Sequence, residues 1–325
     1  MKQITTVFII LISFFSIPLL AQQAPQYSLY MFNKLNWNPA YAGLDYSLSI
    51  TGGYRAQWTN ITDFEGAPRT QYVNAHLPLL FINSGVGIGL ENDQLGARTN
   101  TSLNLSYSYT LDFGKSLLNL GIGTQVVQQS LDGSRLITPS GIYEGIAIDH
   151  QDNILPNTRE NAMALSFNFG AYFYSEALEL GASVFHLNEP TIDYTGFSPT
   201  LNRYFSAYAG VNLEVNNQIT FHPSAFVLSD LTQTQTQATA LFRYNDNIFG
   251  GASLRGYNQN TFDAIVFIAG LKLSNNITFG YAYDLSLSGF NVISNQSHEI
   301  MINYNLNTPI GQGVPPKIIY SPRNF

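Results

Sequence analysis

Apolar and polar residues alternate along most of this chain, so that every second side chain is apolar. Residues 101–112 show this most clearly, because Leu103, Leu105, Tyr107, Tyr109 and Leu111 are separated by asparagine, serine and threonine. Successive side chains of an extended strand point to opposite faces, so the run predicts a strand with one apolar and one polar face. Its length of about ten residues is what a tilted strand needs to cross the hydrocarbon of a bilayer.

Similar runs recur from residue 46 to residue 306, each bounded by turn residues. The predicted strands, about fourteen in number, are residues 47–58, 70–78, 85–91, 101–112, 116–129, 162–174, 178–187, 203–215, 218–228, 237–244, 248–257, 263–273, 277–284 and 298–306. The fold class that we predict is therefore all-β, a transmembrane antiparallel β-barrel of about 14 strands.

The connections between these runs alternate in length. Long connections are predicted at residues 59–69, 92–100, 130–161, 188–202, 229–236, 258–262 and 285–297, and short ones at 79–84, 113–115, 175–177, 216–217, 245–247 and 274–276. Outer-membrane barrels have short periplasmic turns and longer outer loops, whereas a soluble β-sandwich has no reason to follow this rule. The alternation favours the membrane barrel and predicts that both termini are periplasmic.

The composition agrees with a wall that meets lipid outside and water inside. Charged residues make up 11% of the chain, against about 25% in an ordinary soluble domain, while the chain has 20 Tyr and 22 Phe. The absence of cysteine excludes disulfides and thiolate metal sites. A net charge of −7 and a pI near 5.1 argue against nucleic acid as a partner, because binding it requires a basic surface.

The two ends of the chain do not follow the strand pattern. Residues 1–21 contain Lys2, an apolar core from Val7 to Leu20 and Ala21, which together predict a signal peptide. An uncleaved anchor is the alternative, but the apolar core is shorter than the roughly 20 residues of a spanning helix. We predict that residues 22–45 form a periplasmic or plug-like segment, 46–306 the barrel, and 307–325, with four prolines, an extended periplasmic tail.

No catalytic arrangement emerges from the sequence, so we do not expect an enzyme. Five histidines are scattered without the spacing of metal ligands. Asp149 and Asp152, in the longest predicted loop, could bind calcium weakly, but a solvated loop is the simpler interpretation. No metal or other cofactor is predicted. Glycines recur within the predicted strands, for example Gly85, Gly87 and Gly121, where we expect them to relieve crowding in a curved sheet.

Charged residues recur in the polar phase of the predicted strands, so they should point into the lumen. They are Arg55, Glu179, Glu214, Arg243, Arg255, Lys272, Asp284 and Glu299. Charges enclosed by a barrel need partners of opposite sign, which predicts a lumen crossed by salt bridges. A solute pathway through the lumen is the alternative.

Several short motifs together resemble the PorP/SprF family of outer-membrane proteins. They are QYSLYMFNKLNWNPAYAG at 26–43, YRAQW at 54–58, GVGIGLENDQLG at 85–96, YAYD at 281–284, SHEI at 297–300 and SPRNF at the end, where asparagine stands in place of the aromatic residue expected at position 324. The resemblance implies that the motif residues have structural or partner-binding roles. These residues are Asn38, Pro39, Ala40, Ala42, Gly43, Tyr54, Arg55, Gln57, Trp58, Asn92, Asp93, Gly96, Tyr281, Tyr283, Asp284, His298, Glu299, Pro322, Arg323 and Phe325.

The resemblance also implies a function in type IX secretion and gliding motility. A barrel of this family is expected in the outer membrane, in contact with its lipid, where it would receive or anchor the type B C-terminal domain of a secreted surface protein such as an adhesin. Peptidoglycan-associated periplasmic proteins are further expected partners. The alternative function is a 14-stranded channel or transporter for hydrophobic solutes, which a conducting lumen would distinguish.

Overall fold

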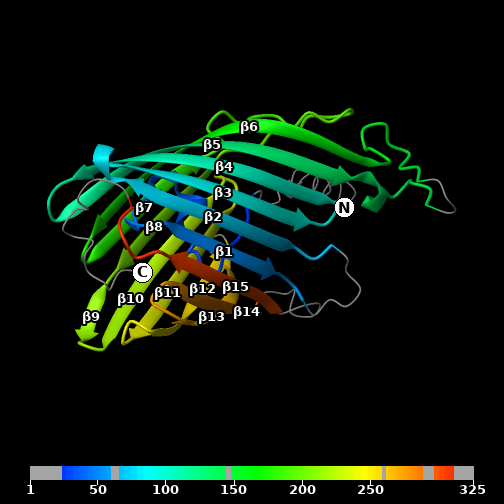
Figure 1. Cartoon of the computed structure of the whole chain (residues 1–325). Helices are drawn as coiled ribbons and strands as arrows, with labels where there is room; N and C mark the ends of the chain where they lie inside the picture. The colour runs from blue at the N-terminus through cyan, green and yellow to red at the C-terminus, as the bar shows by residue number, and fades with distance from the viewer. Residues whose placement is uncertain (1–23, 60–65, 144–147, 258–260, 288–295, 311–325) are drawn as a thin grey trace, which may run out of the picture.

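The strands of the computed structural model close into a single barrel (Figure 1). The structure describes residues 24–59, 66–143, 148–257, 261–287 and 296–310. The strands are β1 (Ser49–Ala56), β2 (Arg69–Leu79), β3 (Ser84–Leu95), β4 (Arg98–Asp112), β5 (Ser116–Asp132), β6 (Arg159–Ser175), β7 (Leu178–Phe185), β8 (Tyr204–Val211), β9 (Leu213–Asn216), β10 (Ile219–Ser229), β11 (Thr234–Tyr244), β12 (Ile248–Tyr257), β13 (Thr261–Lys272), β14 (Ile277–Ser286) and β15 (Gln296–Asn305). The short helices are α2 (Lys34–Trp37), η1 (Pro39–Tyr41), η2 (Leu80–Ile82) and η3 (Gly133–Arg135).

Every strand pairs antiparallel with its neighbours, and β1 pairs with both β2 and β15. Strands β8 and β9 both pair with β10 and are separated only by Asn212, so they count as one interrupted strand of the wall. Counted in this way, the barrel has 14 strands, which confirms the predicted fold class. Among the described residues, no helix is long and apolar enough to cross a membrane.

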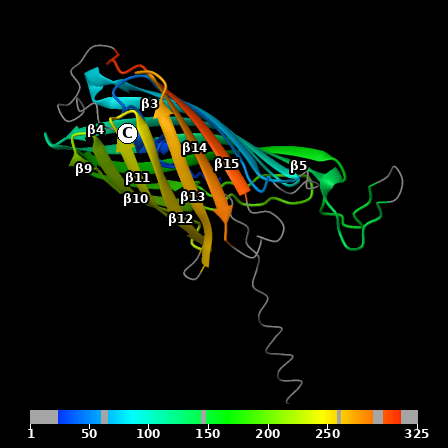
Figure 2. The same cartoon turned by 90° about the horizontal axis from the view of Figure 1, so that it is seen from below.

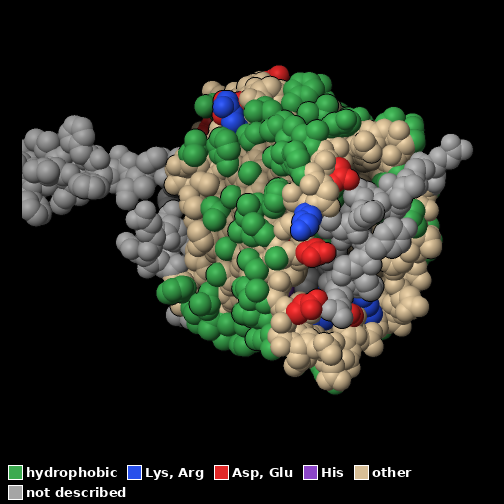
Figure 3. Space-filling model, turned by 90° about the vertical axis from the view of Figure 1, so that its left-hand side faces the viewer, with side chains coloured by type: hydrophobic (Ala, Val, Ile, Leu, Met, Phe, Trp, Pro, Cys, Tyr) green, Lys and Arg blue, Asp and Glu red, His purple; other side chains and the backbone are tan. Residues whose placement is uncertain are grey.

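The barrel wall is apolar outside and polar inside. Along β4, Leu105 and Tyr109 are about half exposed, whereas Ser102 and Ser108 are buried. Hydrophobic side chains cover a broad area of the face shown in Figure 3. This arrangement is the reverse of a soluble barrel and fits a wall surrounded by lipid.

The connections differ in length between the two ends of the barrel. At one end, which we call the long-loop end, the connections include residues 57–68, 133–158, 186–203 and 287–295; at the other, the short-turn end, they are residues 80–83, 113–115, 176–177, 217–218, 245–247 and 273–276. Figure 2 shows the β5–β6 connection standing away from the barrel.

Three details of the predicted wall are wrong. The loop predicted at residues 92–100 does not exist, because β3 extends to Leu95 and β4 already begins at Arg98, with only Gly96 and Ala97 between them. Gly96 has a φ of +60°, which glycine adopts at little cost, so a tight turn replaces the loop. The connection predicted at 229–236 shrinks to residues 230–233, and the strand predicted at 203–215 is interrupted at Asn212.

Residues 24–46 lie inside the barrel rather than in its wall, and we call them the plug. Figure 1 shows this dark blue segment, which contains α2 and η1, enclosed by the strands. Leu29, Tyr30 and Ala40 of the plug are completely buried. The predicted signal peptide, residues 1–21, and residues 311–325 of the predicted tail lie outside the described residues.

Candidate functional site

The plug fills the lumen through aromatic packing. Tyr30 stacks on Phe226 of β10 with ring centroids 4.9 Å apart, and Trp37 lies 5.4 Å from Tyr208 of β8. The Trp37 indole N–H donates to the Tyr30 carbonyl at 3.0 Å, so the plug also folds back on itself. An aromatic segment without strand periodicity can bury its rings only if a wall surrounds it, which the barrel provides.

Asn38 and Pro39 attach the plug to one side of the barrel. The Asn38 side-chain oxygen accepts the N–H of Ala40 at 2.9 Å, which caps the short helix η1 that Pro39 begins. Its amide nitrogen donates to the carbonyls of Ala171 on β6 and Ala182 on β7, at 3.0 and 3.2 Å. One side chain therefore shapes the plug and binds it to two strands.

Glycines in the wall make room for the plug. A Cβ at Gly121 would lie 2.3 Å from the Ala40 nitrogen, one at Gly170 would lie 2.1 Å from Asn38 Oδ1, and one at Gly85 would lie 2.1 Å from the Ala42 carbonyl oxygen. These glycines do relieve crowding, but the crowding at these positions comes from the plug rather than from curvature of the sheet.

A cluster of buried charges ties the plug to the strands on the opposite side. Asp284 of β14 accepts hydrogen bonds from Arg55 of β1 at 2.7 Å and from Arg255 of β12 at 2.6 Å. The Ser28 hydroxyl of the plug donates to Asp284 at 2.7 Å, and its backbone N–H donates to Glu299 of β15 at 2.6 Å. All five residues are at most about 4% exposed, so this network places fixed charges against one point of the plug.

A second buried ion pair lies across the lumen from this network. The Lys34 ammonium group of α2 lies 2.6 Å from Glu179 of β7, and the Tyr172 hydroxyl donates to the same carboxylate at 2.5 Å. The rings of Tyr41, Tyr172 and Tyr208 surround the ammonium group at 5.2 to 5.8 Å from their centroids. These contacts satisfy a charge that would be costly to bury alone.

The end of the plug is held by His76 of β2. Its Nδ1 accepts the backbone N–H of Gly43 at 3.1 Å, and its Nε2 lies 3.4 Å from the Asp45 carboxylate. Burial raises the pKa of Asp45, but the His76 ring and hydrogen bonds from Ser49 and Tyr41 outweigh burial and lower this pKa to about 2. Asp45 is therefore ionised at neutral pH.

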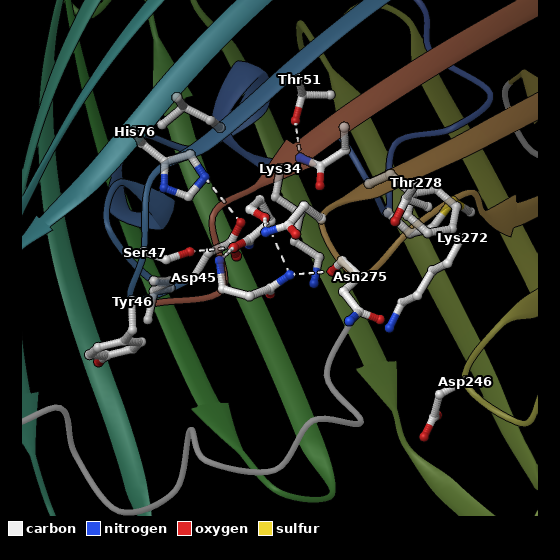
Figure 4. Close-up of a pocket in the computed structure, with 18 of the residues that line it drawn as sticks. Lys34, Asp45, Tyr46, Ser47, Thr51, His76, Asp246, Lys272, Asn275 and Thr278 are labelled. Atoms are coloured by element: carbon white, nitrogen blue, oxygen red, sulfur yellow. Dashed lines mark hydrogen bonds and ion pairs between the residues drawn. The ribbon is translucent and has the colours of Figure 1, made fainter. Parts of the chain in front are cut away.

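A cavity of about 660 Å³ lies between the plug and the wall at the short-turn end. Lys34, Asp45, Tyr46, Lys272 and Asn275 are among the residues that line it (Figure 4). Asp246 and Lys272 lie on one side of the cavity and the plug residues on the other. At the long-loop end, a separate cavity of about 70 Å³ lies between the plug and the wall. Of these two cavities, the one at the short-turn end is much the larger.

Comparison with known proteins identifies the family. The family model described as "Type IX secretion system membrane protein PorP/SprF" matches residues 19–304. The chain belongs to the PorP/SprF family. No curated protein matches it.

Solved structures share the fold of this PorP/SprF protein. The CymD monoaromatic hydrocarbon channel is 11% identical, with a TM-score of 0.50, over 86% of this chain and 94% of that chain. The P. putida toluene transporter TodX is also 11% identical, with a TM-score of 0.50, over 84% of this chain and 93% of that chain. Family and fold together make this chain an outer-membrane barrel of the type IX secretion machinery.

The residues that resemble the PorP/SprF motifs are in several different places. Asn38, Pro39, Ala40, Ala42 and Gly43 belong to the plug, and Arg55, Asp284 and Glu299 form the charge network beneath it. The others are in or near the wall: Tyr54 on β1, Gln57 and Trp58 just beyond it, Asn92 and Asp93 on β3, Gly96 in the β3–β4 turn, Tyr281 and Tyr283 on β14, and His298 on β15. Pro322, Arg323 and Phe325 lie outside the described residues.

The predicted lumen charges do not form one group. Arg255 joins the Asp284 network, Glu179 binds Lys34, and Arg243 is buried and lies 3.6 Å from Asp246. Lys272 lines the cavity. Glu214 lies on β9 near the β9–β10 turn, where it is exposed; its register with Thr220 of β10, which pairs with Arg243, puts it on the inward face at the rim of the barrel.

The sequence pattern did not single out Ser28 and Lys34, the plug residues that contact buried carboxylates of the wall. For Lys34 a signal was present, because it is a lone cation in a long aromatic stretch. A cation there needs an acidic partner on the wall, and Glu179 in the polar phase of β7 is that partner.

Proposed function

We propose that this PorP/SprF barrel receives or anchors the C-terminal domain of a secreted surface protein, such as an adhesin with a type B domain, at its long-loop end. The observation that carries the proposal is the filled lumen. A barrel whose interior is occupied by its own residues 24–46 offers a partner its rim and loops rather than an open passage. Membership in a secretion family supports a protein as that partner.

The long-loop end carries a folded surface for such a partner. In the β5–β6 connection, the buried His150 lies 3.0 and 3.1 Å from the carbonyls of Gly133 and Pro156 through Nε2, and 3.0 Å from the Tyr143 hydroxyl through Nδ1. Around this core, Ile137 and Ile154 are 81% and 56% exposed. A structured loop with exposed apolar side chains is suited to protein binding.

The short-turn end would then serve the periplasmic side. Its cavity of about 660 Å³ and the start of the C-terminal tail, including Asn307 and Pro309 at the cavity margin, lie together there. Peptidoglycan-associated proteins that connect the secretion machinery to the cell wall are the partners that we propose for this end.

Affinity purification from outer membranes of the native host tests the proposed function. One tagged variant has residues 136–155 replaced by a short Gly-Ser linker, and a control variant has residues 230–233 of the same end replaced in the same way. We expect the intact protein and the control to retain a secreted surface protein through its C-terminal domain, and the first variant to lose at least about nine-tenths of it, as expected for a loss of about 1.4 kcal/mol. Equal retention by both variants, or no co-purifying surface protein, would contradict the proposal.

A channel for hydrophobic solutes is the second candidate function. The cavity at the short-turn end favours it, and conductance through the intact barrel would support it. The buried plug and the small size of the cavity at the long-loop end, about 70 Å³, favour the anchoring function instead.

A further inference from the structure

Strand β6 continues beyond its neighbour β7 at the long-loop end. The register of β6 with β5 runs from Ser175 to Arg159, whereas its register with β7 ends at the pair Phe169–Val184. After β7 the chain stays beside β6 only briefly, because the Leu187 N–H donates to the Phe167 carbonyl at 2.9 Å. Among the described residues, the remaining part of β6 has a strand on one side only.

Asn188 closes the last position of this edge. Its side-chain oxygen accepts the N–H of Phe167 at 3.1 Å, and its amide nitrogen donates to the Leu165 carbonyl at 2.9 Å. Backbone groups of alternate residues point to the same side of a strand, so those of Met163 and Asn161 point the same way as those of Phe167. Within the described part of the chain, neither has a hydrogen-bond partner on that side.

The inner face of this overhang is firmly packed. Residues 190–201 fold back beneath it as a hairpin, and Ile192 is completely buried against Val127 and Ala162. The Thr195 N–H donates to Glu160 at 3.1 Å, and the Tyr194 hydroxyl donates to Gln129 at 3.0 Å. The edge is therefore held in extended form before any partner arrives, which lowers the entropy cost of binding.

The outer face of the overhang carries an apolar side chain where the neighbouring strands are polar. Met163 is 64% exposed, and the residues in register with it are Gln128 on β5, Thr101 on β4 and Asn92 on β3. Neither Met163 nor Asn161 is a lysine or proline, the residues that commonly protect an edge strand. An unpaired edge beside an exposed methionine is suited to accepting a strand.

We infer that the open edge of β6 at Asn161 and Met163 binds an extended strand of the secreted partner by β-augmentation. This inference deepens the proposed function and rests on it. An extended strand is the occupant that fits, because only an extended backbone presents N–H and C=O groups at the two-residue spacing of this edge. An apolar residue on its outer face would cover Met163.

Site-specific photo-crosslinking in the native host tests the inference. Benzoylphenylalanine replaces Met163 in one variant and Ile88 in a control; Ile88 is also exposed, but β3 is paired on both sides. We expect a crosslink from position 163 to the C-terminal domain of a surface protein and none from position 88. A crosslink only to a second copy of this chain, or no crosslink at 163, would overturn the inference.

A backbone substitution supplies the second test. Met163→Pro removes the N–H on the open side and leaves the bonds to β5, whereas Met163→Ala keeps that N–H and shortens only the side chain. A heat-dependent shift of the protein band on gels first verifies that both variant barrels are folded. We then expect the proline variant to retain at least about tenfold less partner than the alanine variant. If both retain it equally while the deletion of residues 136–155 releases it, the edge proposal fails and the anchoring function stands.

Discussion

At the scale of single residues, buried charges decide where the plug lies. Asp284 accepts from two arginines and from Ser28, and Lys34 meets Glu179 at 2.6 Å. A buried ion pair contributes little net stability compared with apolar residues, but a charge left without its partner is costly. The pairs therefore select one position of the plug, since any shift would leave several buried charges without partners.

Asp284→Asn should destabilise the barrel by about 3–5 kcal/mol, because it leaves Arg55 and Arg255 without their shared carboxylate. The measurement is the urea midpoint of the detergent-solubilised protein. Glu176→Gln, at an exposed position of the β6–β7 turn, serves as the control and should change the midpoint little. A midpoint for Asp284→Asn equal to that of the control would mean that the network does not stabilise the barrel.

The lowered pKa of Asp45 predicts that the free energy of unfolding depends on pH. Its pKa lies at about 2 in the folded protein, against an ordinary value of 3.8, so it contributes stability that is complete above pH 3.8 and lost as the pH falls toward 2. The difference corresponds to about 2 kcal/mol. Between pH 5 and pH 2, the free energy of unfolding should fall by about this amount more in the wild type than in Asp45→Asn. Parallel pH profiles for the two proteins would contradict the assignment.

At the scale of elements, the plug and the wall fit together through glycines. Gly121 and Gly170 lie on adjacent strands, and each meets the η1 region where a Cβ would have no space. The alternating pattern that makes β5 a membrane strand says nothing about this contact. It arises because the plug backbone, rather than another side chain, packs on the inner face of the strand.

Gly121→Ala should loosen the plug, because the added Cβ would lie 2.3 Å from the Ala40 nitrogen. Trypsin cleavage after Lys34, which is 3% exposed, reports displacement of the plug. Overpacking costs about 1–3 kcal/mol, so we expect cleavage to be about tenfold faster than in the wild type. Gly250→Ala, whose Cβ would meet only the Ile268 carbonyl oxygen at 3.6 Å, should behave like the wild type.

At the scale of the whole molecule, the number of strands in the barrel creates the need for a plug. A barrel of 14 strands encloses more space than inward side chains fill, so the lumen must hold water or another part of the chain. Here the plug, residues 24–46, lies inside the lumen, and a cavity of about 660 Å³ remains at the short-turn end.

Planar-bilayer conductance distinguishes a plugged barrel from a channel. The intact protein should show no steady conductance, whereas a variant in which residues 24–46 are deleted should conduct, because the plug blocks the lumen. The refolded Gly250→Ala barrel, with its plug in place, is the control and should remain closed. Steady conductance through the intact protein would favour the channel.

The sequence by itself determined the fold class and the family. Period-two alternation over runs long enough to cross a bilayer predicts the strands, because side-chain direction in a strand depends only on position along the chain. Such a local pattern needs no knowledge of distant residues. The loop predicted at residues 92–100 failed for the same reason, since polar residues at the end of a long strand look like a loop when they project beyond the apolar band.

Only the tertiary structure decided what fills the barrel and where its edge is open. Ser28 and Glu299 are neighbours although most of the chain separates them, and the pairing of Lys34 with Glu179 depends on how the plug turns at Asn38. The overhang of β6 likewise depends on where β7 ends relative to it. These are long-range contacts, which depend on closure of the sheet around residues 24–46 rather than on any local run of side chains.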